Sequence, residues 1–273
     1  MVAAMSHPMR RLIVKKRKIV KLPRTPSFRL DGNRALVTGA GRGIGLAAAA
    51  ALADAGAEVF LVARTEKEIT AAAAAMIQEG GRAHAAPMDV TDRQAVESLV
   101  HESGPFHVLV NNAGTNRPAP CIGYDEVDFD AIMNLNVRAA YFVASAVASA
   151  LVSAGEEGSI INVSSQMGHV GAPTRTVYCA SKHALEGFSR ALAWELGESG
   201  IRVNTLCPTF IETPLARPML EDKDFKAWVL SKIALGRIGQ VEDLMGAVVY
   251  LASDASRLVT GSALMVDGGW TAA

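Results

Sequence analysis

The stretch "RALVTGAGRGIGLAAAAALADAGAEVFLVAR", residues 34–64, reads as a strand, a glycine loop, a helix and a second strand. Residues 35–38 and 59–63 are short apolar runs, which suit parallel strands buried on both faces. Between them the alanine-rich segment 44–55 predicts a helix that ends at Gly56. Two strands joined through a helix indicate an α/β fold.

The same alternation continues along the chain. Further strands are predicted at 83–88, 108–110, 159–163, 202–206 and 264–266, and further helices at 67–79, 93–103, about 129–154 and 178–199. We therefore expect an α/β fold with a single doubly wound, mostly parallel seven-stranded sheet and helices on both faces. Two segments break the rhythm: residues 1–30, and the Pro-, Thr- and charge-rich segment at about 208–232. We expect a basic N-terminal extension at 1–30 and one domain at 31–273, with 208–232 as a lid.

Charge separates the N-terminal extension from the rest of the chain. Residues 1–30 carry nine basic and no acidic side chains, whereas the remainder carries 18 basic and 27 acidic ones. A basic segment can bind nucleic acid or an anionic membrane. It contains no aromatic interleaving beyond Phe28 and no nucleic-acid motif, so we expect neither partner. An extension from an early translation start, with Met5 and Met9 as alternative starts, is the preferred interpretation.

The cysteines and histidines exclude several kinds of protein. Cys121, Cys179 and Cys207 are odd in number and widely spaced, which implies no disulfide framework and favours the reducing cytoplasm. No apolar run reaches the length of about 18–20 residues that a membrane span needs. The six histidines show no metal-ligand spacing with the cysteines, so no metal site is predicted.

The glycine loop "TGAGRGIG", residues 38–45, predicts a phosphate-binding site. Glycines at 39, 41, 43 and 45 let the backbone turn tightly and approach a pyrophosphate, and the following helix offers free N–H groups. The residues after the second strand indicate which dinucleotide is bound. Ala63 stands where an acidic residue would bind the ribose hydroxyl of NAD, and Arg64 follows it. Arg42 and Arg64 together favour NADP(H) over NAD(H), unless both are solvated surface charges.

Two further strand ends carry polar or small residues, Asp89-Val90 and "NNAG" at 111–114. Ligands of open α/β sheets bind at the carboxyl ends of the strands, although asparagines also form turns. Tyr178 and Lys182 lie four residues apart in a predicted helix and therefore share a face. A nearby ammonium favours the phenolate, so we expect the pKa of Tyr178 to fall from about 10 toward a range useful for acid–base chemistry.

These motifs together resemble the short-chain dehydrogenase/reductase family. The chain matches Thr-Gly-x-x-x-Gly-x-Gly at 38–45, Asn-Asn-Ala-Gly at 111–114 and Tyr-x-x-x-Lys at 178–182, with Ser165 thirteen residues before the tyrosine. The family's helix asparagine falls at Asn136 in "NLNVRAAYF", and the closing "VTGSALMVDGG" also matches. The resemblance covers about residues 31–270 and fits the shorter, oxidoreductase branch.

The resemblance implies hydride transfer between a nicotinamide cofactor and a secondary alcohol or ketone. Tyr178 would be the general acid and base, Ser165 would bond the reacting oxygen, Lys182 would hold the nicotinamide ribose, and Asn136 would position a relay water. The expected cofactor-binding residues are Gly39, Arg42, Gly43, Ile44, Gly45, Arg64, Asp89, Val90, Asn112, Ala113, Gly114, Tyr178, Lys182, Pro208, Ile211 and Thr213. Thr209 departs from the family, which has a glycine there.

The expected substrate is small and hydroxylated, such as a sugar acid, a polyol or a keto-sugar. Asn116, Gln166, His169 and Thr209 would face it, although His169 is alternatively a loop histidine bonded to backbone. The apolar side chains of the lid suit an acyl chain instead, so 3-oxoacyl-carrier-protein reduction is the alternative activity. A dinucleotide sensor or scaffold is the non-enzyme alternative. Family resemblance also implies a homotetramer or homodimer.

Overall fold

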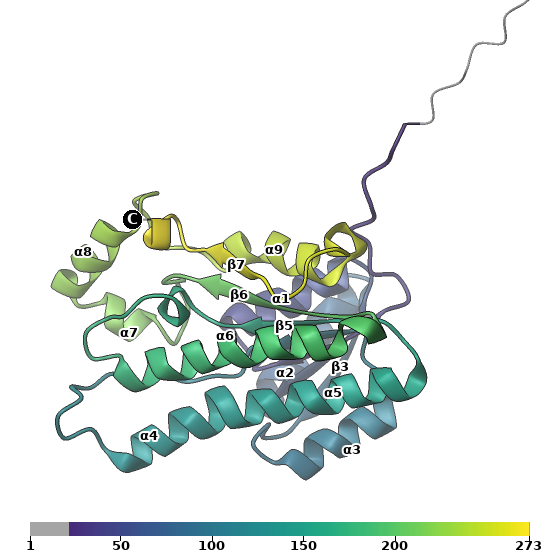
Figure 1. Cartoon of the computed structure of the whole chain (residues 1–273), viewed down its shortest axis with the longest axis horizontal. Coiled ribbons are helices and arrows are strands. Elements are labelled where there is room, and N and C mark those ends of the chain that lie inside the picture. The colour runs from purple at the N-terminus through teal and green to yellow at the C-terminus, as the bar shows by residue number, and fades with distance from the viewer. Residues whose placement is uncertain (1–21, 273) are drawn as a thin grey trace, which may run out of the picture.

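A computed structural model describes residues 22–272, so most of the predicted basic extension lies outside the described residues. Seven parallel strands form one sheet in the order β3-β2-β1-β4-β5-β6-β7 (Figure 1). The strands are β1 Arg34–Thr38, β2 Glu58–Ala63, β3 Arg82–Pro87, β4 Val108–Asn111, β5 Gly158–Val163, β6 Ile201–Pro208 and β7 Ala263–Val266. The predicted doubly wound fold is confirmed, and every strand pair in the sheet is parallel.

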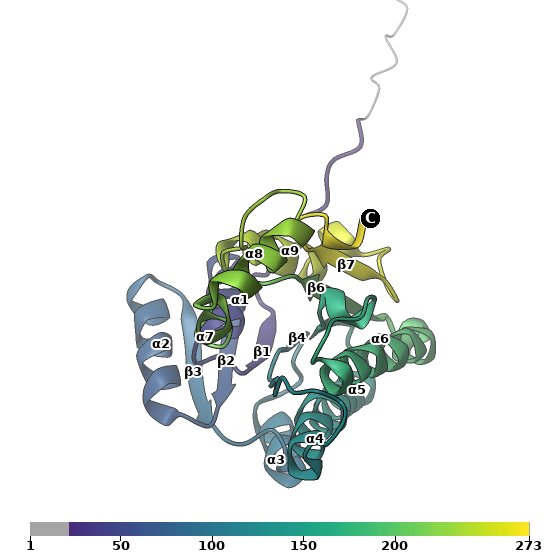
Figure 2. The same ribbon diagram turned by 90° about the vertical axis from the view of Figure 1, so that its left-hand side faces the viewer.

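Helices cover both faces of the sheet (Figure 2). They are α1 Gly43–Asp54, α2 Glu66–Gln78, α3 Arg93–Ser103, α4 Glu126–Met133, α5 Ala140–Ala154, α6 Thr176–Leu196, α7 Arg217–Leu220, α8 Lys223–Lys232 and α9 Glu242–Ala252. Helices α1, α2 and α9 bury one apolar cluster, whereas α3, α5 and α6 bury the other. Adjacent strand residues point to opposite faces, so Val37 joins the first cluster and Leu36 the second. This explains the uninterrupted apolar run of β1, whereas the edge strand β3 alternates buried and exposed residues at its start.

The strand order reverses between β1 and β4. From β1 the chain passes to β2 and β3 on one side, and β4 then returns to pair with the other side of β1. Loops that leave the carboxyl ends of β1 and β4 therefore run in opposite directions. A crevice opens between them, and this is where open α/β sheets bind ligands.

The helix predicted at about 129–154 is longer than expected and contains a π-helical turn. It runs from Glu126 to Ala154, with the segment Asn134–Ala139 in π-helical form. It begins early because the Asp125 carboxylate accepts hydrogen bonds from two backbone N–H groups of the first turn. Its length, and a mean hydropathy of 1.5 over an 18-residue window within it, would by themselves suit a membrane span. However, Val147 and Leu151 are fully buried in the second cluster, as expected for a core helix.

The domain boundary and the lid differ in detail from the predictions. Leu30, assigned to the extension, is 1% exposed and its N–H donates to the carbonyl of Ala55, so it belongs to the folded domain.

Helix α6 begins two residues before the predicted start and ends at Leu196, because the chain tightens into a 3₁₀ turn at Gly197–Ser199. The segment at 208–232 contains α7 and α8. It packs through an aromatic cluster of Phe210, Phe225, Trp228 and Trp270.

Candidate active site

The glycine loop after β1 is shaped by close backbone contacts. Gly39 and Gly43 have φ angles of +65° and +57°, a region that disfavours side chains. A Cβ atom on Gly45 would lie 2.2 Å from the carbonyl oxygen of Gly39. Helix α1 starts at Gly43 without any side-chain cap, so its first N–H groups are available to a phosphate.

A threonine and an asparagine join the ends of β1 and β4. Thr38 Oγ1 accepts hydrogen bonds from the N–H groups of Asn112 at 2.9 Å and Ala113 at 3.0 Å. The Asn112 side chain donates back to the carbonyl of Thr38 at 2.9 Å. These reciprocal bonds hold the glycine loop and the Asn-Asn-Ala-Gly loop together, so both line the same crevice.

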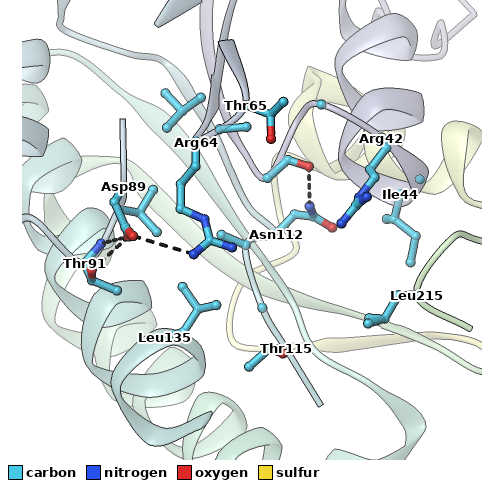
Figure 3. A pocket seen from close by; sticks show the side chains of 18 of the residues that line it. Arg42, Ile44, Arg64, Thr65, Asp89, Thr91, Asn112, Thr115, Leu135 and Leu215 are labelled. Carbon is cyan, nitrogen blue, oxygen red and sulfur yellow. Dashed lines mark hydrogen bonds and ion pairs between the residues drawn. The ribbon is translucent and has the colours of Figure 1, made fainter. Parts of the chain in front are cut away.

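A cleft of about 460 Å³ occupies this crevice (Figure 3). The predicted cofactor residues that line it are Gly39, Arg42, Gly43, Ile44, Arg64, Asp89, Val90, Asn112, Ala113, Gly114 and Thr213. Gly45 lies behind the loop, where it allows the close approach to Gly39. An elongated cleft that meets an uncapped helix N-terminus has the form that a dinucleotide requires.

Two arginines stand at the end of the cleft beside β2. The Arg42 and Arg64 side chains are 70% and 78% exposed, and each approaches a carboxylate, Glu68 or Asp89, only to 3.9 Å. Figure 3 shows the Arg64 side chain extended toward Asp89. Thr65 precedes α2, and its hydroxyl forms no capping hydrogen bond with the first N–H groups of that helix. These donors suit an additional phosphate group.

A smaller pocket of about 150 Å³ adjoins the cleft and holds most of the predicted catalytic residues. Ile44, Gly114 and Thr213 line both cavities, so the two are continuous. The other predicted residues in the pocket are Asn112, Asn116, Ser165, Gln166, Tyr178, Lys182, Pro208, Thr209 and Ile211. The structure thus brings together residues from the ends of β4, β5 and β6 and from α6.

Burial, and not the neighbouring lysine, has the largest effect on the pKa of Tyr178. Burial raises the pKa of Tyr178 to about 12, and its hydrogen bond with Ser165 opposes this only in part. The predicted fall in this pKa is therefore wrong for the chain by itself. Ser165 Oγ also donates to Gln166 Oε1 at 2.6 Å and accepts from the N–H of Met167, which fixes its position beside the phenol.

The Lys182 ammonium is tied to the sheet. Its Nζ atom donates to the carbonyl of Val163 at 2.8 Å and lies 5.6 Å from the centre of the Tyr178 ring. Burial lowers the pKa of Lys182 to about 8, and the neighbouring acidic groups Cys207 and Glu186 oppose this only in part. At neutral pH the group therefore remains mostly cationic next to the phenol.

Asn136 lies in the π-helical turn, a feature that is frequent at functional sites. Its side-chain amide donates to the carbonyl of Thr115 at 2.9 Å and to Ser181 Oγ at 3.1 Å. Its Oδ1 atom accepts from the N–H of Thr115 at 2.8 Å. The asparagine is outside the lining of the pocket and joins the loop after β4 to helix α6.

Three of the four predicted substrate residues line the pocket, namely Asn116, Gln166 and Thr209. The buried Oδ1 of Asn116 and Oγ1 of Thr209 have no hydrogen-bond partner among the described residues. His169 lies elsewhere, because its ring packs against Cys207 and Glu186 on the far side of the loop. The sequence analysis missed Phe210 and Ala216, two apolar residues that also line the pocket. Their positions in the sequence, directly after Thr209 and Leu215, were the available signal.

Comparison with known proteins assigns the chain to a family. Residues 39–271 match the profile described as Enoyl-(Acyl carrier protein) reductase. The gluconate 5-dehydrogenase of Gluconobacter oxydans (strain 621H) is 40% identical over 89% of this chain and 96% of its own length. The L-xylulose reductase of Bos taurus is 37% identical over 90% of this chain and 99% of its own length.

Solved structures agree with this assignment. A gluconate 5-dehydrogenase from Burkholderia cenocepacia J2315, solved in complex with NADP and tartrate, superimposes with a TM-score of 0.86. It is 39% identical, over 90% of this chain and 98% of its own. A short-chain type dehydrogenase/reductase from Mycobacterium marinum superimposes with a TM-score of 0.85 at 37% identity, over 90% of this chain and 98% of its own.

Proposed function

The chain belongs to the short-chain dehydrogenase/reductase family, and we propose that it interconverts a small polyhydroxylated ketone and its secondary alcohol with NADP(H) as the preferred cofactor. Membership of the family makes it a nicotinamide-dependent oxidoreductase that acts on CH–OH groups. The substrate class, the cofactor preference and the residue roles below are our proposals.

The unpartnered polar atoms of the small pocket carry the substrate proposal. Asn116 Oδ1 and Thr209 Oγ1 are buried beside the Ser165–Tyr178 pair without partners among the described residues. A buried polar atom without a hydrogen bond costs about 1–3 kcal/mol, so a substrate with several hydroxyl groups gains where an apolar chain does not. The relatives named as gluconate 5-dehydrogenase and L-xylulose reductase support this class.

The cofactor preference rests on the end of β2. No carboxylate occupies position 63, and the largely exposed side chains of Arg42 and Arg64 both line the cleft. Guanidinium groups form strong bidentate bonds with phosphate, whereas NAD(H) would offer them only a hydroxyl. The NADP bound to the Burkholderia cenocepacia relative supports the preference.

The proposed mechanism assigns one task to each residue of the pocket. When bound, the nicotinamide cofactor supplies or accepts the hydride. In reduction, Tyr178 transfers its phenolic proton to the substrate oxygen, and the Ser165 hydroxyl turns from Gln166 Oε1 to donate its one hydrogen bond to the same oxygen. In oxidation Tyr178 takes that proton back. The Lys182 ammonium would stabilise the phenolate and would bind the ribose hydroxyls of the cofactor. Asn136, which donates to the carbonyl of Thr115, would hold that loop for a relay water.

We also propose that the chain assembles into a homotetramer or homodimer through α5 and α6, which lie side by side (Figure 1). Trp194 on α6 is 89% exposed, and Tyr141 and Val152 on α5 are also exposed. Large apolar side chains gathered on adjacent helices favour association with a second copy.

The proposal is tested by following NADPH oxidation with a panel of ketones. The panel contains keto-sugars, keto derivatives of sugar acids and a 3-oxoacyl thioester. We expect at least one polyhydroxylated ketone to give kcat/KM on the order of 10⁴ M⁻¹s⁻¹ or more. Tyr178→Phe is the control, which should retain NADPH binding without turnover. Turnover of the thioester alone would overturn the substrate class and favour the acyl-carrier alternative.

A further inference from the structure

Three potential metal ligands meet behind the active site. His169 follows the loop after β5, Glu186 lies on α6, and Cys207 lies on β6. Cys207 Sγ is 3.6 Å from His169 Nε2 and 3.3 Å from Glu186 Oε1, and those two atoms are 3.4 Å apart. Zinc-to-ligand distances of about 2.0–2.3 Å at tetrahedral angles require edges of roughly 3.3–3.6 Å between ligands. The three atoms therefore already form one face of such a tetrahedron.

Apart from their contacts with one another, the three atoms have one further hydrogen-bond neighbour among the described residues, Thr205 Oγ1, which lies 3.5 Å from Cys207 Sγ. The other carboxylate oxygen of Glu186, Oε2, accepts a hydrogen bond from Thr205 Oγ1 at 3.0 Å and lies 3.8 Å from Arg190. This orients Oε1 toward Cys207 and His169. Second-shell bonds of this kind orient carboxylate ligands in metal sites.

A nearby hydroxyl is a second sign that the cluster is incomplete. Ser164 Oγ is buried without a hydrogen-bond partner among the described residues. A Cβ atom on Gly168 would lie 2.9 Å from this oxygen and 3.2 Å from Glu186 Cγ, so the hydroxyl and the carboxylate side chain flank the same small space. A buried polar group of this kind is normally satisfied by protein, water or an ion.

The cluster combines buried ligands with an opening to solvent. Glu186 and Cys207 are 3% and 0% exposed, whereas the His169 side chain is 25% exposed. A cation can therefore enter past the imidazole and then lose most of its water. Thiolate, imidazole and carboxylate together match the preferences of Zn²⁺, and hard cations such as Mg²⁺ prefer oxygen ligands.

We propose that His169 Nε2, Glu186 Oε1 and Cys207 Sγ form a binding site for one divalent cation of the zinc class. The cation displaces the thiol proton of Cys207 to solvent, and the two anionic ligands balance its charge. A fourth position is left for water. The site joins the loop that begins at Ser165, the helix turn after Lys182 and the strand that ends at Pro208. Binding would therefore cross-link three elements that build the catalytic pocket.

The test uses Co²⁺ as a spectroscopic probe on the full chain without an affinity tag, first stripped of metal with a chelator. We expect one Co²⁺ per chain, with the visible bands of tetrahedral cobalt and a near-ultraviolet thiolate-to-cobalt charge-transfer band. Zn²⁺ should displace the cobalt and raise the Tm, because it binds the folded state preferentially. His169→Gln should weaken binding by at least about tenfold and remove the Tm shift.

Matched variants separate this site from other histidines and cysteines. His183→Gln changes an exposed histidine on α6, the helix that carries Glu186. The His183 ring bonds only to a backbone carbonyl, so this variant should leave cobalt binding unchanged. Cys207→Ser should abolish the charge-transfer band, whereas Cys179→Ser should retain it. If Cys207→Ser fails to fold, the His169 and His183 pair still decides the question. Absence of the bands in the wild type, or equal affinity in His169→Gln, would overturn the proposal.

Discussion

The ammonium of Lys182 lies 5.6 Å from the centre of the Tyr178 ring and donates its hydrogen bond to the carbonyl of Val163. The two side chains share no hydrogen bond, and burial outweighs any effect of the lysine charge on the phenol. Because the same burial that excludes water also disfavours both ionised forms, the phenol has its pKa raised to about 12 and the ammonium has its pKa lowered to about 8. This opposition predicts how each direction of the reaction depends on pH.

Reduction and oxidation should respond differently to pH. Reduction needs the protonated phenol of Tyr178, whose raised pKa keeps it protonated throughout the neutral range. Its kcat should therefore be nearly flat between about pH 6 and 8. Oxidation needs the phenolate, so its kcat should rise almost tenfold per pH unit below pH 8. Above that pH the rise should weaken, because Lys182 begins to lose its charge.

Steady-state rates in both directions, measured at saturating cofactor, check these profiles. A variant with Lys182→Met should lose most of the oxidation rate while the pocket retains its shape. An oxidation rate that is independent of pH between about pH 6 and 9 would contradict the assignment of Tyr178 as the general base.

Arg64 should carry much of the preference for NADPH. Its guanidinium is 78% exposed at the end of the cleft and is only loosely paired with Asp89. We expect the wild type to bind NADPH at least about tenfold more tightly than NADH, which corresponds to about 1.4 kcal/mol. Arg64→Ala should remove most of this difference by weakening NADPH binding alone. Fluorescence titration with both cofactors measures it.

The matched control for this titration is Arg257→Ala, which removes an exposed arginine outside the cleft. It should leave both affinities unchanged, so that a general charge effect can be separated from a local contact. Equal affinity of the wild type for NADH and NADPH would refute the proposed preference without affecting the family assignment.

The fold was predictable from sequence because its strands are apolar on both faces. Val37 and Leu36 fill different cores, so β1 appears in the sequence as an uninterrupted apolar run, and the glycine loop marks the crevice beside it. The helix starts were less predictable. Asp125 caps α4 through its own side chain, and a lone aspartate in a polar loop does not reveal that it will do so.

The site was predictable only where its residues are fixed by local spacing. The motifs place Ser165, Tyr178 and Lys182 correctly in one pocket. The spacing of four residues shows that Tyr178 and Lys182 share a helix face, but it contains no information on burial, which dominates both pKa values. His169 meets Glu186 and Cys207 only through the packing of a loop, a helix and a strand, so no sequence spacing indicates that cluster.

Thr209 should determine part of the substrate specificity. Its buried hydroxyl has no partner among the described residues, and the residue lines the pocket that holds the catalytic pair. Thr209→Val keeps the shape of the side chain but removes the hydroxyl. We expect kcat/KM for a polyhydroxylated ketone to fall by about tenfold or more, which corresponds to the loss of one hydrogen bond. NADPH affinity should be unchanged.

Steady-state kinetics with a polyhydroxylated ketone and with a simple ketone distinguish this role from a structural one. The loss should be specific to the hydroxylated substrate. Thr174→Val, which removes an exposed hydroxyl bonded only to neighbouring groups, is the control. Equal losses on both ketones would show that Thr209 supports the loop instead of the substrate.

Trp194 should be central to assembly. An indole that is 89% exposed on α6 is unusual unless another surface covers it. Trp194→Glu should shift the protein to a smaller species, because a carboxylate buried between subunits would lack a partner. Light scattering after size-exclusion chromatography measures the mass. Ile122→Glu, at an equally exposed loop position, should leave it unchanged, and an unaltered mass for Trp194→Glu would exclude this face.

Gly45→Ala should weaken cofactor binding through a backbone clash. A Cβ atom at this position would lie 2.2 Å from the carbonyl oxygen of Gly39 and 2.5 Å from the Asn112 side chain, neither of which can move without opening the loop. We expect NADPH affinity to fall by at least about tenfold and the Tm to fall as well. Gly246→Ala is the matched control, since it enters open space within α9 and should stabilise the fold by about 0.5–1 kcal/mol. NADPH titration and thermal unfolding measure both variants. If the close approach of Gly45 to Gly39 shapes the phosphate site, the Tm should fall in Gly45→Ala and rise in Gly246→Ala. Wild-type NADPH affinity in Gly45→Ala would mean that the loop relaxes freely and that its glycine spacing is not required for binding.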